Sequence, residues 1–107
     1  MIVDKLEKSI YYCELYNFYR KLLTKKRNQI FYDYYFKDIG LTEISENLKI
    51  SRQAVLDSIK KTEIMLDDYE KKLKLHNIFN KQKEIINNIQ KTNNTTLIDK
   101  ILVQWEE

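Results

Sequence analysis

The chain has 107 residues with no proline, one glycine and one cysteine; 43% of its residues are hydrophobic and 33% are charged. This length is enough for a single core that folds without disulfides, and the near absence of helix-breaking residues favours long helices over sheet. The net charge of +3 combines +5 over residues 1–91 with −2 over residues 92–107. Such a balance argues against a strong non-specific DNA binder and predicts DNA binding that is modest and salt-sensitive.

Three functional classes are disfavoured by what the sequence lacks. Cys13 is its only cysteine and His76 its only histidine, so neither an internal disulfide nor a zinc cluster is expected. No nucleophile and base pair and no glycine-rich phosphate loop is suggested, and we interpret the chain as a non-enzyme without cofactor or metal. No apolar run is long enough to span a bilayer, and residues 1–20 do not form a signal-peptide core. These features predict a cytoplasmic protein with no membrane insertion.

Two amphipathic helices are predicted in the first third of the chain. Apolar residues at steps of four, three and four predict a helix over residues 4–23; they are Tyr11, Leu15, Phe18 and Leu22. Thr24 is a suitable N-cap for a second helix over residues 25–36. The packing stripe of that helix is expected to be Ile30, Phe31, Tyr34 and Tyr35. Tyrosines can stack on nucleic-acid bases, but three of the eight here, Tyr11, Tyr34 and Tyr35, fall on these stripes, which makes core packing the better interpretation.

A helix-turn-helix is predicted over residues 41–62, after a break in the pattern at residues 38–40. It needs a short helix, a tight turn and a second helix, here starting at Arg52, whose inward residues hold the pair together. The inward residues are expected to be Ile44, Leu48, Ile50, Val55 and Ile59. Such a unit usually lays its second helix along the major groove of DNA, although the same pattern also occurs as a plain packing element.

The ends of these two helices carry recognisable signals. Thr42 and Ser51 are each expected to cap one of them, because a side-chain oxygen there can accept from a free backbone N–H. Lys49 occupies the turn, where a left-handed conformation is more often adopted by Gly or Asn. The small Ser45 is expected where the two helices approach each other closely.

The second helix of this unit is predicted to continue as a long heptad seam. Steps of four and three residues alternate along Val55, Ile59, Thr62, Leu66, Tyr69, Leu73 and His76. A further apolar face follows a bend expected near Asn77; it consists of Ile78, Phe79, Ile85, Ile86 and Ile89. The seam can be satisfied within one chain or by a second copy, and its length favours a homodimer. The predicted dimerisation residues are Leu66, Tyr69 and Leu73.

The last part of the chain is predicted to form a separate short helix. Residues 91–95 are polar and have the composition of a linker. Thr96 with Asp99 three residues later resembles a capping box, and the apolar side of the helix that follows includes Trp105. A lone tryptophan on such a stripe is usually an anchor in a packed groove, of the same chain or of a partner.

The outward face of the second motif helix supplies candidate DNA contacts. Arg52 is a cation in the first turn, where it opposes the helix dipole unless an anion such as phosphate, or a guanine edge, compensates. The alternative is a solvated side chain whose stem covers Ile50. Gln53 beside it can read an adenine bidentately. By their spacing along the helix, Leu56, Lys60 and Lys61 extend this candidate face.

Charge at two further places bears on the same question. Lys25, Lys26 and Arg27 open the helix capped by Thr24, which suggests a phosphate-facing edge, with a solvated charge run as the alternative. Asp57 argues against DNA contact by this face, because an acid on a groove-reading face repels phosphate unless it accepts from a cytosine amine or pairs with a neighbouring lysine. The candidate DNA-binding residues are therefore Arg52, Gln53, Leu56, Lys60, Lys61, Lys25, Lys26 and Arg27.

Three segments resemble the YlxM family, small bacterial proteins similar to region four of sigma factors. They are SRQAVLDSIKKTEIMLDDYEKKLKL at 51–75, FYRKLLTKK at 18–26 and DIGLTEISENLKI at 38–50. The resemblance implies an all-α helix-turn-helix bundle with a long helix and a C-terminal helical extension. It also implies a DNA-binding protein that is encoded beside signal recognition particle genes and assists or regulates that pathway. The matching motif positions are Ser51, Arg52, Gln53 and Ala54. The chain departs from the family pattern at Arg27, where Gln is usual, and at Leu56, which often corresponds to Tyr.

Two functions of different classes follow. The first is a DNA-binding regulator, a homodimer that presents two recognition helices to related half-sites. The second is a protein- or RNA-interaction module among the signal recognition particle components, without sequence-specific DNA binding. Asp57 and the low net charge favour the second, whereas Arg52, Gln53 and the cationic helix starts favour the first. Either way we expect a helical domain over residues 1–62 and a helical extension over residues 63–107 that carries the dimer seam.

Overall fold

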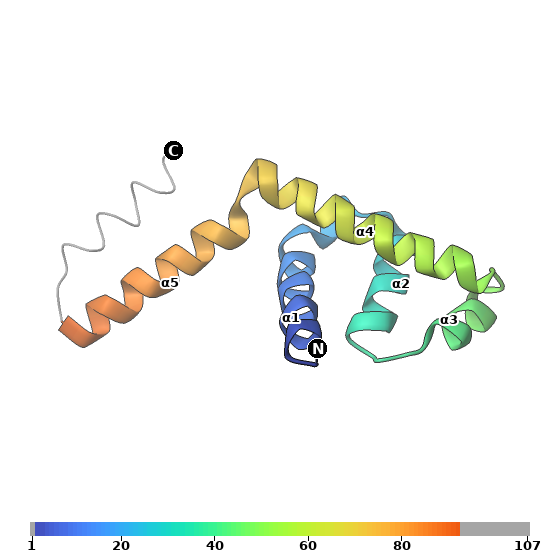
Figure 1. Cartoon of the computed structure of the whole chain (residues 1–107). Helices are drawn as coiled ribbons and strands as arrows, with labels where there is room; N and C mark the ends of the chain where they lie inside the picture. Colours follow the sequence, from blue (N-terminus) through green and yellow to red (C-terminus); the bar gives the residue numbers. More distant parts are fainter. Residues whose placement is uncertain (1, 93–107) are drawn as a thin grey trace. The chain divides into compact units, whose positions relative to one another are not determined.

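Every element in the described part of the chain is helical (Figure 1). The computed structural model describes residues 2–92, with side chains from residue 5 to residue 91. In chain order the elements are α1 (Ile2–Tyr19), the 3-10 turn η1 (Arg20–Leu22), α2 (Lys25–Tyr35), α3 (Leu41–Leu48), α4 (Arg52–Leu73) and α5 (Leu75–Thr92). They fall into two compact units, Met1–Lys72 and Leu73–Glu107. The prediction of an all-α fold built on a helix-turn-helix is confirmed.

The core of the first unit lies where α2, α3 and α4 meet. Its central residues are Ile30, Ile44, Val55 and Ile59, each no more than 3% exposed. Packed around them are the partly buried Tyr35, Ile39, Leu41, Leu48 and Ile50. All five residues predicted to face inward from the helix-turn-helix belong to this cluster. Because each buried branched side chain contributes about 1.5–3 kcal/mol, the cluster holds α3 and α4 in a defined arrangement.

The turn between α3 and α4 is built much as predicted. Lys49 has left-handed backbone angles, φ 57° and ψ 43°, and the backbone N–H of Ile50 donates to the Ser45 carbonyl at 3.1 Å. Ser45 is 8% exposed, as expected for a close approach. Ser51 caps α4, since its Oγ accepts from the backbone N–H of Ala54 at 3.0 Å.

The predicted cap of α3 was wrong. Gly40, not Thr42, is the N-cap, and the carbonyl of Gly40 accepts from the backbone N–H of Ile44 at 3.0 Å. The helix begins at Leu41, so Thr42 already lies inside its first turn. The Thr42 carbonyl accepts instead from the Ser45 hydroxyl at 2.6 Å. The extended backbone of Gly40 is what a cap position requires, and glycine fulfils it without a side-chain bond.

The buried face of α1 differs from the predicted stripe. The buried residues at this end of the chain are Leu15, Tyr16, Tyr19 and Leu23. Leu15 is fully buried as predicted, but Tyr11 is 38% exposed and Leu22 is 52% exposed. The α-helix ends at Tyr19, and the tighter 3-10 turn that follows carries Leu22 outward and Leu23 inward.

Tyrosine hydroxyls of α1 and α2 donate to carboxylates of α4. The pairs are Tyr12 to Asp67 Oδ2 at 2.8 Å, Tyr19 to Glu70 Oε1 at 2.7 Å, and Tyr35 to Glu63 Oε1 at 3.2 Å. The ring of Tyr16 stacks on Phe31 with centroids 5.0 Å apart, and Phe31 stacks on Tyr35 at 4.4 Å. At these positions the tyrosines are used for packing and for tying helices together, in line with the interpretation that the stripes form the core.

The predicted heptad seam is used largely within the chain. Leu66 is completely buried by its own chain, which leaves it no surface to offer a second copy. Tyr69 packs against Tyr19 with ring centroids 5.9 Å apart, and its hydroxyl donates to the Leu22 carbonyl at 3.4 Å. Leu73, the third predicted dimer residue, is 49% exposed. Of the two alternatives for the seam, packing within one chain accounts for Leu66.

The long helix ends earlier than expected. Lys74 has a left-handed φ of 57° and separates α4 from α5, whereas a bend was predicted near Asn77. His76 therefore lies in the first turn of α5, not near the end of a long helix, and its Nδ1 is 3.3 Å from Asn80 Nδ2.

The second unit contributes the amphipathic helix α5 to the described part of the chain. Ile78, Ile85 and Ile89 are half-buried, Phe79 is 45% exposed, and Gln82 is 8% exposed. The predicted terminal helix with Trp105 lies outside the described residues. No helix in the described part of the chain is both long and apolar enough to cross a membrane.

Candidate nucleic-acid interface

The candidate residues of α4 occupy its exposed first turns. Arg52 and Gln53 are exposed just after the Ser51 cap, and Lys60 and Lys61 are exposed farther along. Leu56 is only half exposed, because it lies on the flank of the helix nearer the core. The first turn of α4 contains no acidic residue, so its positive dipole end is open to an anion.

Asp57 has a neutral partner on its own helix. Its Oδ1 accepts from Gln53 Nε2 at 2.9 Å, between two exposed side chains one turn apart. The sequence offered two ways to accommodate this acid, a cytosine amine or a neighbouring lysine, and the bond to Gln53 is a third. The bond uses one of the two N–H groups of the Gln53 amide and leaves the other N–H and the amide oxygen available. Asp57 therefore orients the one side chain of this turn that can read an adenine edge.

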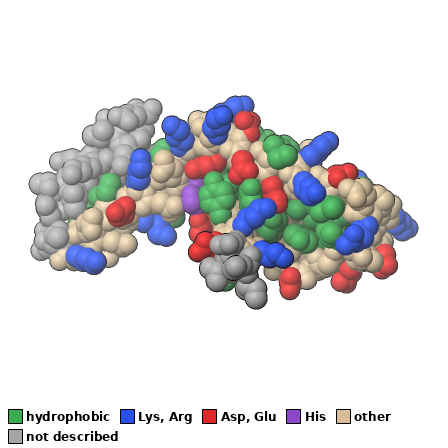
Figure 2. All heavy atoms as spheres, viewed as in Figure 1, with side chains coloured by type: hydrophobic (Ala, Val, Ile, Leu, Met, Phe, Trp, Pro, Cys, Tyr) green, Lys and Arg blue, Asp and Glu red, His purple; other side chains and the backbone are tan. Residues whose placement is uncertain are grey.

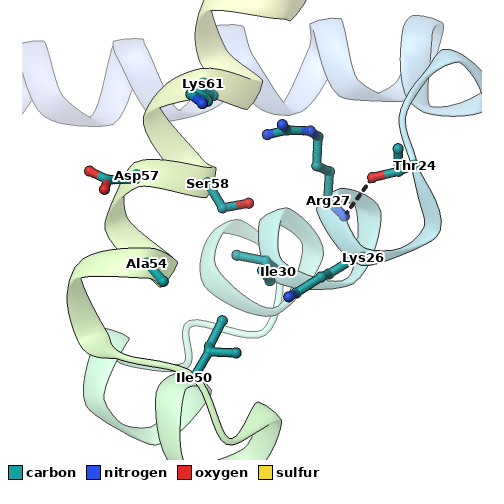
Figure 3. Close-up of a pocket in the computed structure, with 9 residues that line it drawn as sticks. All are labelled: Thr24, Lys26, Arg27, Ile30, Ile50, Ala54, Asp57, Ser58 and Lys61. Atoms are coloured by element: carbon teal, nitrogen blue, oxygen red, sulfur yellow. Dashed lines mark hydrogen bonds between the residues drawn. The ribbon is translucent and has the colours of Figure 1, made fainter.

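A hollow of about 420 Å³ joins the start of α2 to one flank of α4 (Figure 3). The residues that line it are Thr24, Lys26, Arg27, Ile30, Ile50, Ala54, Asp57, Ser58 and Lys61. In Figure 3 Arg27 extends from α2 toward the stretch of α4 that carries Ser58 and Lys61, whereas Asp57 points away from α2. Cations from two separate candidate segments therefore meet on one surface.

The first turn of α2 has a well-defined local structure. Thr24 caps the helix as predicted, its Oγ1 accepting from the backbone N–H of Arg27 at 3.3 Å. That turn has no acidic residue, so its cations reinforce the positive end of the dipole. Asn28 anchors the turn, because its Nδ2 donates to the Arg20 carbonyl at 2.9 Å and to the Leu23 carbonyl at 3.2 Å. Asn28 was missed in the sequence, where only its place one turn after Thr24 could have indicated the role.

The remaining candidates do not join this hollow. Leu56 and Lys60 line a second hollow on the other flank of α4, about 280 Å³ in volume. Lys25 is exposed at the start of α2 and lines neither hollow. The second hollow also contains Lys5 and Lys8 of α1, which were not predicted as contacts. Their three-residue spacing on one helix face was the available signal.

Charge on the face shown in Figure 2 is mixed: Lys and Arg side chains are interspersed with Asp and Glu around exposed apolar surface. The charge on this face therefore does not form a patch of one sign. Burial, and after it Glu14, raises the pKa of the Cys13 thiol, which keeps the thiol protonated and weakly nucleophilic. No group of three or more His, Cys, Asp or Glu side chains in the described residues is placed to hold a metal ion.

Comparison with known proteins places these features in a family. The family model described as "Putative helix-turn-helix protein, YlxM / p13 like", UPF0122, matches residues 6–104. A UPF0122 protein of Geobacillus sp. (strain WCH70) is 46% identical over 85 residues, covering 79% of this chain and 77% of that protein. UPF0122 protein YlxM of Bacillus subtilis (strain 168) is 45% identical over 85 residues, with the same coverage of 79% and 77%. A UPF0122 protein of Staphylococcus epidermidis (strain ATCC 12228 / FDA PCI 1200) is 38% identical over 94 residues, covering 87% of this chain and 86% of that protein. The chain belongs to the UPF0122 family of YlxM-like helix-turn-helix proteins.

Proposed function

We propose that this protein is a DNA-binding regulator that lays the first turns of α4 in the major groove. The observation that carries the proposal is the hollow of Figure 3, where Lys26 and Arg27 from α2 face the same space as Lys61 from α4. A backbone phosphate in this hollow would meet three cations and the positive end of α2. With the phosphate held there, the exposed start of α4 can reach base edges.

Two residues of the first turn then serve sequence recognition. Arg52 can donate bidentately to a guanine edge, and Gln53, oriented by Asp57, can present its amide oxygen and its second N–H to adenine. The Asp57 carboxylate still repels phosphate, but it orients Gln53 for base recognition. The division of work is the usual one, in which phosphate contacts position the protein and base contacts specify the site.

The test is a fluorescence anisotropy titration with a labelled duplex of mixed sequence at several salt concentrations. For the wild-type protein, the affinity should fall steeply as salt rises, because each phosphate contact releases counterions. The triple variant Lys26→Gln, Arg27→Gln, Lys61→Gln should bind more weakly, and its plot of log affinity against log salt should be shallower by about 3. The double variant Lys71→Gln, Lys72→Gln, at the far end of α4, is the control for lost charge. A wild-type protein with no duplex affinity even at low salt would overturn the proposal.

An interaction module is the second candidate, and one observation favours it. Ile64 is 67% exposed on α4 and continues the outer line of Gln53, Asp57 and Lys60 at helical spacing. A large exposed aliphatic side chain beside charged groups is common in protein-binding faces. Pull-downs from native lysate with and without nuclease separate the two candidates, because partners held through DNA or RNA are lost on digestion.

Two finer expectations, a homodimer and an association with signal recognition particle components, rest on the sequence and its family resemblance. Leu73 is the one predicted dimer residue that retains about half of its surface, at 49%. Light scattering at high micromolar concentration tests the dimer: a stable monomer would end that expectation. The same pull-downs, probed for the RNA and protein of the particle, test the association.

A further inference from the structure

The second hollow, on the other flank of α4, is a built feature of the first unit. Its residues come from three helices: Lys5, Lys8 and Ser9 of α1, Tyr34 and Tyr35 of α2, and Leu56, Ile59, Lys60 and Glu63 of α4. Its floor is the core residue Ile59, 3% exposed, so the hollow is fixed by the packing of the unit. Its rim carries Lys5, Lys8 and Lys60, all exposed.

The two hollows on the flanks of α4 have the same balance of charge. Each is lined by three cations and one carboxylate. In each, the carboxylate accepts from a neutral donor: Asp57 from Gln53 at 2.9 Å, and Glu63 from Tyr35 at 3.2 Å. Each hollow therefore carries a net positive charge, and in each the acid is partly occupied by its own neighbour. An anionic chain passing along either flank meets an attractive surface.

The helical repeat separates the two sets of residues. One flank of α4 carries Ala54, Ser58 and Lys61, and the other carries Leu56, Lys60 and Glu63. By helical spacing, Gln53 lies between the two flanks on the outer side of the helix. An α-helix with its side chains is about 10–12 Å across, and the major groove of B-DNA is about 12 Å wide. A helix seated in that groove consequently has one sugar–phosphate strand on each side.

We propose that the second hollow contacts the backbone of the DNA strand opposite to the one held at Lys26 and Arg27. This inference rests on the proposed function and deepens it, because it identifies the ligand as a duplex gripped on both strands. Lys5, Lys8 and Lys60 supply the phosphate contacts. Lys8 Nζ lies 5.8 Å from the centre of the Tyr12 ring, and the Tyr12 hydroxyl is bonded to Asp67 on α4. The end of α1 is thereby held beside α4 with its lysines on the same flank as Lys60.

The experiment compares three double variants in the full chain. Lys5→Gln with Lys8→Gln removes two of the three cations of the second hollow, and Lys26→Gln with Arg27→Gln removes two of the three of the first. Lys71→Gln with Lys72→Gln is the matched charge control. The probe is a labelled duplex about 20 base pairs long, roughly two helical turns, and a single strand of the same length. Affinity is measured at several salt concentrations between about 50 and 200 mM.

The salt dependence of duplex binding is the decisive readout. Each of the two hollow variants should make the plot of log affinity against log salt shallower by about 2, because about 0.9 is lost for each phosphate contact. The control should leave that slope within about half a unit of wild type. A second-hollow variant that matches the control would overturn the inference while leaving the proposed function intact. A wild type without duplex affinity would instead remove the proposed function itself.

Two further measurements, binding of the single strand and thermal unfolding, test the two-strand arrangement and the integrity of the variant. A single strand offers one backbone, so the duplex should bind more tightly and lose more affinity with the second-hollow variant. Equal affinity and equal loss for both probes would overturn the two-strand arrangement. Thermal unfolding by circular dichroism should be unchanged in that variant, since Lys5 and Lys8 are exposed. If the unfolding temperature of that variant changes, the single variant Lys60→Gln replaces it in the test. Lys60→Gln should make the plot of log affinity against log salt shallower by about 1.

Discussion

In the described part of the chain, left-handed backbone at residues other than glycine marks three breaks between helices. Asp38, Lys49 and Lys74 have φ of 55°, 57° and 57°. Lys49 ends α3 and Lys74 separates α4 from α5. A side chain in this conformation costs roughly 1 kcal/mol because its Cβ crowds the following carbonyl. The chain accepts that cost where glycine would be the usual residue.

Replacing Lys49 by glycine should therefore stabilise the first unit. Lys49→Gly removes the crowding but adds freedom to the unfolded chain, and we expect a net gain of about 0.5 kcal/mol in the free energy of unfolding. The matched control is Lys60→Gly inside α4, which should lose about 1 kcal/mol. Urea denaturation monitored by circular dichroism measures both. A loss of stability in Lys49→Gly would mean that its side chain contributes more than its backbone costs.

Substitutions at Arg52 and at Asp57 should change DNA affinity in opposite directions. Arg52→Ala should weaken binding to a preferred site by about 1–3 kcal/mol, because a bidentate base contact is lost. Asp57→Asn should strengthen non-specific binding by removing repulsion, and should relax selection for adenine because the bond that orients Gln53 weakens. Selection of bound sequences from a random pool, followed by titration, measures both effects. If neither substitution changes affinity or selection, α4 does not read the groove.

At the scale of one element, α4 has two opposite faces that serve different purposes. Its inner face carries Val55, Ile59, Thr62 and Leu66, all buried, and Thr62 satisfies its hydroxyl by donating to the Ser58 carbonyl at 2.8 Å. Its outer face carries the charged and amide residues of the candidate interface. A single helix therefore both completes the core and presents the proposed DNA contacts, which couples binding to the integrity of the fold.

Truncation to alanine of two leucines and an isoleucine of α4 should change the free energy of unfolding by clearly different amounts. Leu66→Ala should lower the free energy of unfolding by about 2–5 kcal/mol, because a fully buried side chain leaves a cavity. Ile64→Ala, two residues away and 67% exposed, should change it by less than about 0.5 kcal/mol. Leu73→Ala, 49% exposed, should lie between them at about 1 kcal/mol. Equal effects at Leu66 and Ile64 in chemical denaturation would contradict the assignment of faces.

At the scale of the whole first unit, phenol–carboxylate bonds tie α1 and α2 to α4. Burial, followed by the hydrogen bond to Asp67, raises the pKa of the Tyr12 hydroxyl above its usual 10.0. Burial and the charge of Glu63 do the same for the pKa of Tyr35. The folded state thus keeps these protons at a pH where the unfolded state releases them. Their contribution to stability is present below pH 10 and is lost as the pH rises toward the raised pKa values.

The free energy of unfolding should consequently fall as the pH rises above about 10. In the double variant Tyr12→Phe, Tyr35→Phe this fall should be less steep, while stability at neutral pH drops by about 1–2 kcal/mol through the lost hydrogen bonds. Tyr32→Phe, at a ring that is 43% exposed, is the control. Denaturation curves measured from pH 8 to pH 11 provide the comparison. Parallel curves for the double variant and wild type would show that these two hydroxyls do not govern the alkaline loss.

Much of the helix-turn-helix was predictable because its signals are local in the chain. Thr24 and Ser51 act as caps within three residues of their partners, and Lys49 turns the chain by its own backbone angles. The inward set of α3 and α4 follows from the helical repeat, so it too could be derived from spacing. Gly40 was missed as a cap because a threonine nearby has the stronger side-chain signal.

Only the tertiary structure decided what covers each apolar face and which charges meet. Periodicity shows that a face is apolar, but it does not distinguish a neighbouring helix from a second copy, so the burial of Leu66 within its own chain had to be observed. The same holds for charge: Lys26 and Lys61 share one hollow, and Lys8 and Lys60 the other, because of how α1 and α2 pack on α4. The helices were set by interactions over three or four residues. The two flanks of the candidate interface were set by contacts between distant parts of the chain, which spacing in a sequence does not encode.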